Sequence, residues 1–138
     1  MNNVIIFTNE LGGVSICKPT GEIPIEIVQL KDIPEGKQSY IVDDETLPKN
    51  DSDFFDAWEQ TNGVITVNIL KAKEIKKKYL RFEREPLLIQ QDILFQRALE
   101  NGLSTTEIVT EKQRLRDLPT LADSAQTLEE LRLIKASL

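Results

Sequence analysis

The stretch ILKAKEIKKKYLRFEREPLLIQQDILFQRALENG, residues 69–102, decides the fold because it is the longest segment with one consistent period. Its apolar residues recur at spacings of three and four, which predicts an amphipathic helix. Pro86, near the middle, lacks an amide hydrogen and its ring meets the carbonyl of Phe82, so we expect the helix to kink or break there. Asn101 and Gly102 favour the left-handed conformation that ends a helix.

Before Pro86, two faces of this helix are expected. Seven lysine and arginine residues fall within residues 71–84, and several of them share one face opposite an apolar stripe. We interpret this face as the solvated side of an amphipathic helix or as a face paired within the chain; binding to nucleic acid or to an acidic protein is the alternative. The stripe consists of Ala72, Ile75, Tyr79 and Phe82, and the cationic face of Lys73, Lys77, Arg81 and Arg84.

The region after Pro86 predicts further helices. Apolar pairs at residues 87–88, 94–95 and 98–99 stack on one helix face. The sequence STTE, residues 104–107, has the spacing of a capping box and predicts a helix that Pro119 ends. A short last helix is expected to open at Thr127.

The first 68 residues alternate β-branched stretches with turns, which predicts a small antiparallel sheet and short helices. The fold class is therefore α+β, with an acidic β-rich region 1–68 and a helical region 69–138 that packs or extends as one unit. The expected elements are a hairpin in 2–22 around Asn9 and Gly12-Gly13, a short helix in 23–36, a strand and acidic turn in 39–48, an N-capped helix in 50–63, and a last strand of the sheet in 64–68.

Charge is divided unevenly along the chain. Residues 1–68 hold 4 Lys or Arg against 12 Asp or Glu, and residues 69–138 hold 13 against 11, which gives the net charge of −6. An acidic first half repels a polyanion, so a protein that mainly coats nucleic acid is not expected.

Several kinds of chemistry lack their residues. The chain has no histidine and only one cysteine, Cys17, which removes the commonest general base and zinc sites of the Cys/His type. Gly12-Gly13 fits no phosphate-binding loop, and the acids from Asp51 lack the glycine and glutamate of a calcium loop. We therefore expect no enzyme, no cofactor and no metal site. A single cysteine and the lack of an apolar span or leader also indicate a cytoplasmic protein without a membrane segment.

Apolar side chains are the candidates for contact with a protein partner. The aromatic group in 54–58 is interpreted as a plug between helix and sheet or as an exposed anchor, since Trp and Phe favour interface centres. The apolar face after Pro86 is the second candidate, although its residues fit a core equally well. The partner-binding candidates are Phe54, Phe55, Trp58, Leu87, Leu88, Phe95 and Leu99.

Four motifs resemble a known group of proteins. They are VDD-x-x-LP at 42–48, F-x-x-AW at 54–58, R-x-P-LL…D-x-x-F-x-RALE-x-G at 84–102 and KQ-x-LRD at 112–117. Together they are similar to small proteins encoded by phages and prophages of Gram-negative bacteria, and the last two resemble the C-terminal segment of phage tail and tail-fibre assembly proteins. The resemblance covers about Tyr40 to Leu118, and the segment after Pro119 departs from it.

This resemblance implies a non-enzymatic, chaperone-like factor that covers an apolar surface of a tail or tail-fibre protein before assembly. Two other functions remain open. One is an acidic decoy or inhibitor that binds a host nucleic-acid-binding protein through residues 43–59. The other is a structural protein that self-associates as a homo-oligomer through its long helices.

Overall fold

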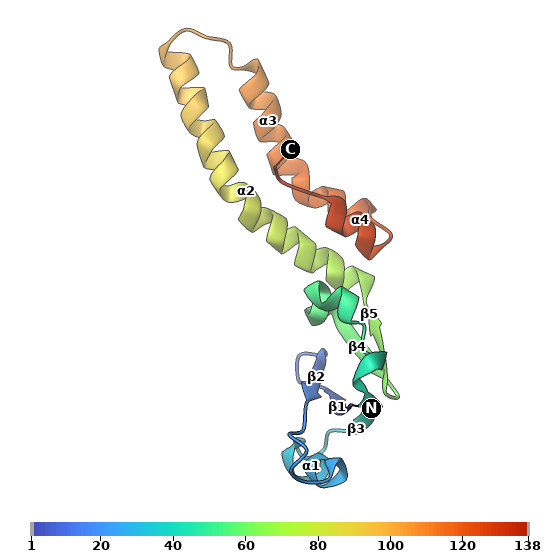
Figure 1. Cartoon of the computed structure of the whole chain (residues 1–138). Coiled ribbons are helices and arrows are strands. Elements are labelled where there is room, and N and C mark those ends of the chain that lie inside the picture. Colours follow the sequence, from blue (N-terminus) through green and yellow to red (C-terminus); the bar gives the residue numbers. More distant parts are fainter. Residues whose placement is uncertain (1, 138) are drawn as a thin grey trace. The chain divides into compact units, whose positions relative to one another are not determined.

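The computed structural model describes residues 2–137 and divides the chain into two compact units, Met1–Ala72 and Lys73–Leu138. The first unit contains the strands and the second consists of helices (Figure 1). The predicted α+β class is confirmed. Each unit has a core of its own, described separately below.

A three-stranded antiparallel sheet forms the first part of the first unit. Its central strand is β1 (Asn3–Thr8), which pairs with β2 (Val14–Cys17) on one side and with β3 (Ser39–Asp43) on the other. The predicted hairpin is confirmed. In its turn, the side-chain oxygen of Asn9 accepts hydrogen bonds from the amides of Leu11 and Gly13 at 3.0 and 3.1 Å, which fixes the turn locally.

The last strand predicted in the first half belongs to a separate sheet. β5 (Val64–Val67) pairs with β4 (Trp58–Thr61), and these two strands form their own antiparallel hairpin. The prediction that 64–68 completes the N-terminal sheet is therefore wrong. Asn62 and Gly63 have φ of 52° and 84°, the left-handed pair that a two-residue hairpin turn requires, so the Asn-Gly dipeptide was the signal for it.

Residues 50–63 also differ from the predicted N-capped helix. The short helix α1 (Ile25–Asp32) is confirmed, but the next helical segments, η1 (Asp44–Thr46) and η2 (Lys49–Ala57), are 3₁₀ turns. η2 follows Pro48 without a side-chain cap, and Asp51 and Phe54 inside it leave the helical conformation. Short 3₁₀ pieces replace an α-helix here because the chain must reach the extended strand at Trp58.

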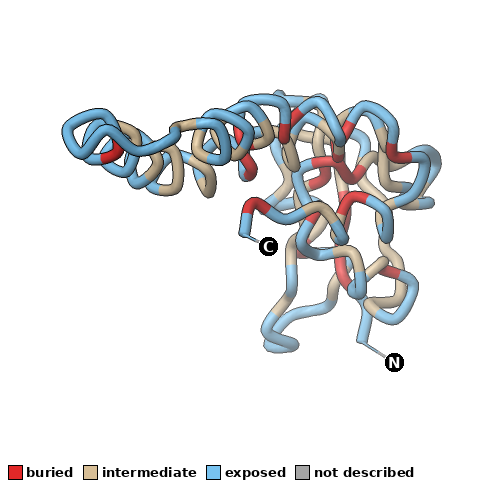
Figure 2. Tube along the Cα trace, turned by 90° about the horizontal axis from the view of Figure 1, so that it is seen from above, coloured by how far each residue is buried: buried red, intermediate tan, exposed pale blue. Residues whose placement is uncertain are grey.

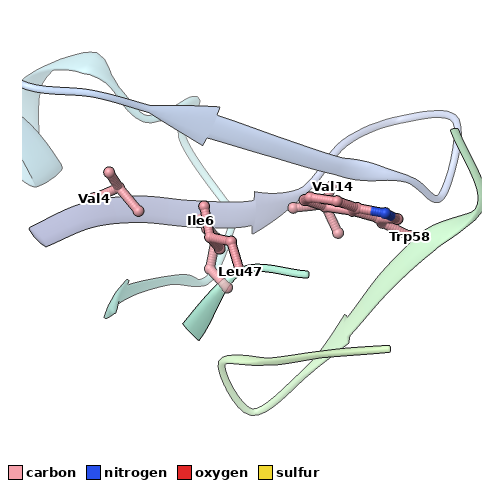
Figure 3. Packing of buried hydrophobic residues seen from close by; sticks show 5 residues of the cluster. All are labelled: Val4, Ile6, Val14, Leu47 and Trp58. Carbon is pink, nitrogen blue, oxygen red and sulfur yellow. The ribbon is translucent and has the colours of Figure 1, made fainter. Parts of the chain in front are cut away.

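The core of the first unit gathers around strand β1. Val4, Ile6, Val14, Leu47 and Trp58 pack together, as Figure 3 shows. The indole nitrogen of Trp58 donates a hydrogen bond to the carbonyl of Asp51 at 3.1 Å, so the ring is buried without an unpaired donor. Trp58 thus joins the two-stranded hairpin to the three-stranded sheet.

The second unit is built on the long helix α2 (Ile69–Glu100), which begins in the first unit and runs through Pro86 without a break. The side-chain oxygen of Asn68 accepts from the amides of Leu70 and Lys71 and caps its start. Gly102 has φ of 65°, which confirms the predicted left-handed end. The chain then returns along α2 as α3 (Thr106–Asp117), and the two form a hairpin of helices (Figure 1).

The C-terminal segment completes the second core. After α3 come a 3₁₀ segment, η3 (Leu118–Ser124), and a short helix, α4 (Leu128–Leu133). Leu80 of α2, Leu118 and Ala136 form the buried centre, with Leu87 and Ile134 packed against it. A residue close to the end of the described chain therefore fills the space between helices.

The two predicted helix caps have different outcomes. The hydroxyl of Thr127 accepts from the amide of Glu130 at 3.1 Å, so this cap is confirmed. At α3 the cap position is Thr105, which makes no side-chain cap bond, and the Ser104 hydroxyl accepts from the amide of Thr106 at 3.3 Å instead. The predicted reciprocal capping box is wrong because the helix starts one residue later than the STTE spacing requires.

Candidate protein-binding surface

The polar groups of the first unit serve its own structure. Within residues 2–137, no group of three or more His, Cys, Asp or Glu side chains is placed to hold a metal ion. Asp44 bonds to Lys49 at 2.5 Å, and this bond holds the pKa of the Asp44 carboxyl below its ordinary value. Asp43 accepts from the amide of Glu45, and Glu59 pairs with Lys71 at 2.7 Å, which lowers the pKa of Glu59. These acids stabilise turns and helix starts.

The aromatic candidates of the first unit are mostly core residues. Phe54 and Trp58 are 4% and 3% exposed. Both are therefore buried packing residues, as in the interpretation of this group as a plug, and not exposed anchors. Phe55 is partly exposed and its ring lies 4.9 Å from that of Trp58. Trp58 also lies at the start of a strand and not on the expected helix. Only Phe55 of this group presents substantial apolar surface to solvent.

The candidates on α2 lie at different places along it. Leu87 is half-buried against the core of the second unit, and Leu88 is half-buried as well. Phe95 is half-buried beneath the ammonium of Lys112, 5.0 Å from its ring centroid. Leu99 is 55% exposed, near the end of the helix. The prediction thus grouped three half-buried residues with one exposed leucine.

The cationic face of α2 points toward the C-terminal helices. Lys73 donates to the carbonyl of Asp123 at 3.1 Å, and Lys77 pairs with the carboxylate of the same residue. Arg84 donates to the carbonyls of Leu115 and Arg116 at 3.1 and 2.8 Å. Of the two readings of this face, these contacts support intramolecular pairing. It is the packed side of the helix, with Leu80 between the cations.

The apolar stripe is consequently on the outside. Of its four members only Ala72 is buried, whereas Tyr79 is 56% and Phe82 is 81% exposed. The interpretation of the cationic face as paired within the chain holds for Lys73, Lys77 and Arg84, whereas Arg81 is exposed. The expectation that the stripe is the buried side of the helix is wrong, because the side with Leu80 packs against the C-terminal segment. We define the outer seam as the residues Ile75, Tyr79, Phe82, Pro86, Ile89 and Ile93.

A second apolar surface lies where α2 turns into α3. A cleft of about 670 Å³ opens there, and its lining leucines Leu94 and Leu103 are 38% and 65% exposed. Leu99 is 55% exposed but does not line this cleft. Figure 2 shows that exposed residues cover most of this helical hairpin. Nothing in the sequence pattern distinguished Leu103, because it stands in the loop after Gly102. We call this the tip cleft, lined by Leu94, Ala98, Leu103 and Ile108 with the polar Arg97, Asn101, Ser104, Thr106 and Glu107.

Comparison with known proteins adds no family to this picture. No protein-family model, curated protein or solved structure matches this chain. Between residues 2 and 137, no helix is both long enough and apolar enough to cross a membrane. The candidates for binding a protein are therefore two apolar surfaces of the second unit, the tip cleft and the outer seam.

Proposed function

We propose that this protein is a non-enzymatic binding factor that covers an apolar segment of another protein, in the manner of a phage tail or tail-fibre assembly factor. The observation that carries the proposal is the tip cleft, in which leucines are exposed at the end of a helical hairpin. Exposed apolar surface rimmed by polar side chains is typical of protein interaction sites. The resemblance of the 84–102 and 112–117 motifs to tail assembly proteins supplies the partner class.

The composition of the cleft suits an amphipathic segment. Leu94, Ala98 and Leu103 provide an apolar floor, while Arg97 and Glu107 at the edge offer one charge of each sign. A partner helix that lays its apolar side into the cleft would bury these leucines and meet both charges at the rim. Binding of this kind protects an aggregation-prone segment in the cytoplasm of the host until it is assembled.

The test is co-expression with a phage tail-fibre protein. We expect the wild type to raise the soluble yield of that protein and to co-purify with it, and the double substitution Leu94→Ser/Leu103→Ser, which changes both lining leucines, to abolish both effects. Leu11→Ser, at an exposed position in the hairpin turn of the first unit, is the matched control and should behave as the wild type. Retention of binding in the double variant, with its helical content unchanged, would contradict the proposed site.

A further inference from the structure

The outer seam has the spacing of a coiled-coil interface. Its members follow one another at four, three, four, three and four residues, so they repeat every seven positions, and such a repeat keeps side chains on one line of a helix. At about 100° per residue, this line lies on the side of α2 opposite Leu80 and Leu87. α2 therefore carries two apolar faces, of which only the inner one is covered by the C-terminal helices.

Large side chains stand open along this line. Tyr79, Phe82, Ile89 and Ile93 are all exposed, and a groove of about 410 Å³ lies beside Tyr79, Phe82 and Pro86. Pro86 fits this exposed side because the carbonyl of Phe82, left without an amide partner, can bond to water there. A continuous aromatic and aliphatic ridge of this kind is unusual on a solvated helix face.

The charges beside the seam are arranged by sign. Lys76 and Lys78 flank its N-terminal end, and Glu83 and Glu85 flank its middle. Lys78 and Glu85 make no ion pair within residues 2–137. A helix that is basic at one end and acidic further along is complementary to a copy of itself running in the opposite direction.

We infer that the outer seam binds the outer seam of a second copy of this chain, with the two α2 helices antiparallel. Tyr79 of each copy then lies opposite Phe82 of the other, and Ile75 lies opposite Pro86. In the same register Lys78 lies opposite Glu85, and Lys76 opposite Glu83, twice each by symmetry. The interface is isologous, and it does not depend on the tip cleft or on the proposed function.

A parallel pair satisfies the charges less well. In that arrangement Lys78 would lie opposite Glu83, but Glu85 would lie opposite the neutral Gln90, so only one kind of attractive contact forms where the antiparallel pair has two. The antiparallel register gives the two unpaired charges, Lys78 and Glu85, each other as partners. Charge complementarity therefore favours the antiparallel dimer.

The length of the seam sets the strength of the dimer. From Ile75 to Ile93 the helix rises about 27 Å, which is shorter than the three to four heptads of a stable two-stranded coiled coil. We expect a reversible dimer with a dissociation constant on the order of 10–100 µM, as is usual for small interfaces.

Sedimentation equilibrium on the full chain measures the dimer directly. Protein concentrations up to about 1 mM reach about ten times the upper limit expected for the dissociation constant. We expect Phe82→Ser to weaken it by at least about tenfold, since a central aromatic carries much of an interface. The matched control Leu103→Ser changes the tip cleft and should leave the dissociation constant unchanged. A wild type that stays monomeric throughout, or a Phe82→Ser protein that dimerises normally while its circular dichroism is unchanged, would overturn the inference.

Charge reversal tests the direction of the helices. Lys78→Glu or Glu85→Lys alone should weaken the dimer several-fold, about 3- to 10-fold for two like-charge contacts. The double variant Lys78→Glu/Glu85→Lys exchanges the signs and should restore wild-type affinity if the helices are antiparallel. If the double variant stays as weak as Lys78→Glu, the antiparallel register is refuted, because a parallel pair would still place residue 78 against Glu83.

Discussion

At the residue scale, two neighbouring apolar side chains of α2 have opposite environments. Leu80 is fully buried in the second core, whereas Phe82, two positions on, is mostly exposed. The periodicity of the sequence did not separate them, because apolar residues occur on both sides of this helix at helical spacing. The structure shows that Leu80 lies on the same packed face of α2 as Lys77 and Arg84.

This difference predicts unequal costs of truncation. Leu80→Ala should lower the free energy of unfolding by about 2–5 kcal/mol, since it leaves a cavity in a closed core. Phe82→Ala removes a larger side chain but should change it by no more than about 0.5 kcal/mol, because the site is already hydrated. Urea unfolding followed by circular dichroism, at a protein concentration below dimerisation, measures both. Equal losses would show that Phe82 is buried in solution.

Glu111 gives the second unit a dependence on acid. Its carboxylate is bound by Arg114 at 2.6 Å, and this pair lowers the pKa of Glu111 below its ordinary value of 4.5. Arg114 also donates to the carbonyl of Ala136 at 2.7 Å, so the pair holds the C-terminal segment. Because the folded pKa is the lower one, the contribution of Glu111 is complete above about pH 4.5 and is lost as pH falls through the folded pKa.

We therefore expect Glu111→Gln to have a lower melting temperature than the wild type at pH 7. Between pH 5 and pH 3, the melting temperature of Glu111→Gln should fall by less than that of the wild type. Glu10→Gln, at an exposed position in the hairpin turn of the first unit, is the control, and its melting temperature should change with pH as that of the wild type does. Thermal unfolding followed at 222 nm across this range decides the matter. Parallel curves for Glu111→Gln and the wild type would exclude the pair as a source of acid sensitivity.

At the element scale, Pro86 sets the character of α2. The sequence predicted a kink or a break, and the helix continues. Pro86 removes one amide, but the surrounding turns stay helical because Leu80, Leu87 and the cations on the inner face are fixed to the C-terminal segment. Packing thus keeps the helix from breaking, and α2 bends near its middle, as the predicted kink requires (Figure 1).

Replacing this proline should stabilise the helix. Pro86→Ala supplies an amide for the carbonyl of Phe82 and removes the ring, and both changes stabilise the helix. Alanine also gives the unfolded chain more freedom than proline does, which destabilises the fold. We expect the free energy of unfolding to rise by about 1–2 kcal/mol in total. Pro34→Ala, in the loop after α1, gives the control with the opposite sign, a loss of about 0.4–1 kcal/mol. Chemical denaturation compares the two. A loss in Pro86→Ala would mean that the proline contributes packing that outweighs its missing hydrogen bond.

Among the elements, those with a strong local signal were predicted well. The hairpin around Asn9, the helix after Pro24 and the cap at Thr127 each follow from side chains that bond within a few residues. The 3₁₀ segment η2 and the separate β4–β5 sheet were not predicted. Their form depends on the burial of Trp58 against residues distant in the sequence. The tip cleft was not predicted, since none of the partner-binding candidates lines it and its leucines, Leu94 and Leu103, come together across the turn.

At the scale of the whole molecule, the two units have cores without shared residues. The first centres on β1 and Trp58, and the second on Leu80 and Leu118. We expect Leu80→Ala to speed hydrogen exchange at the amides of α3 while leaving those of β1–β3 unchanged. Exchange measured residue by residue by NMR distinguishes this from joint opening. Acceleration in both sets of amides would show that α2 couples the units into one cooperative structure.

The division into regions 1–68 and 69–138 was drawn where the period changes from strand to helix, and compactness divides the chain at Ala72. The two boundaries differ because they are defined by different properties of the chain. A change of period marks the start of an element, whereas a compact unit includes the first turn of that element when side chains such as Lys71 bond back to the strands. A sequence pattern contains the first kind of boundary only.

The position of Ala136 bears on the order in which the chain folds during synthesis. Its side chain is fully buried, its amide donates to Glu83, and its carbonyl accepts from Arg114. The first core is complete once Val67 has left the ribosome, but the second must wait for residue 136. Throughout that interval the inner leucines of α2 and α3 are exposed to solvent. The nascent chain is therefore most exposed to proteases and chaperones just before translation of this segment ends.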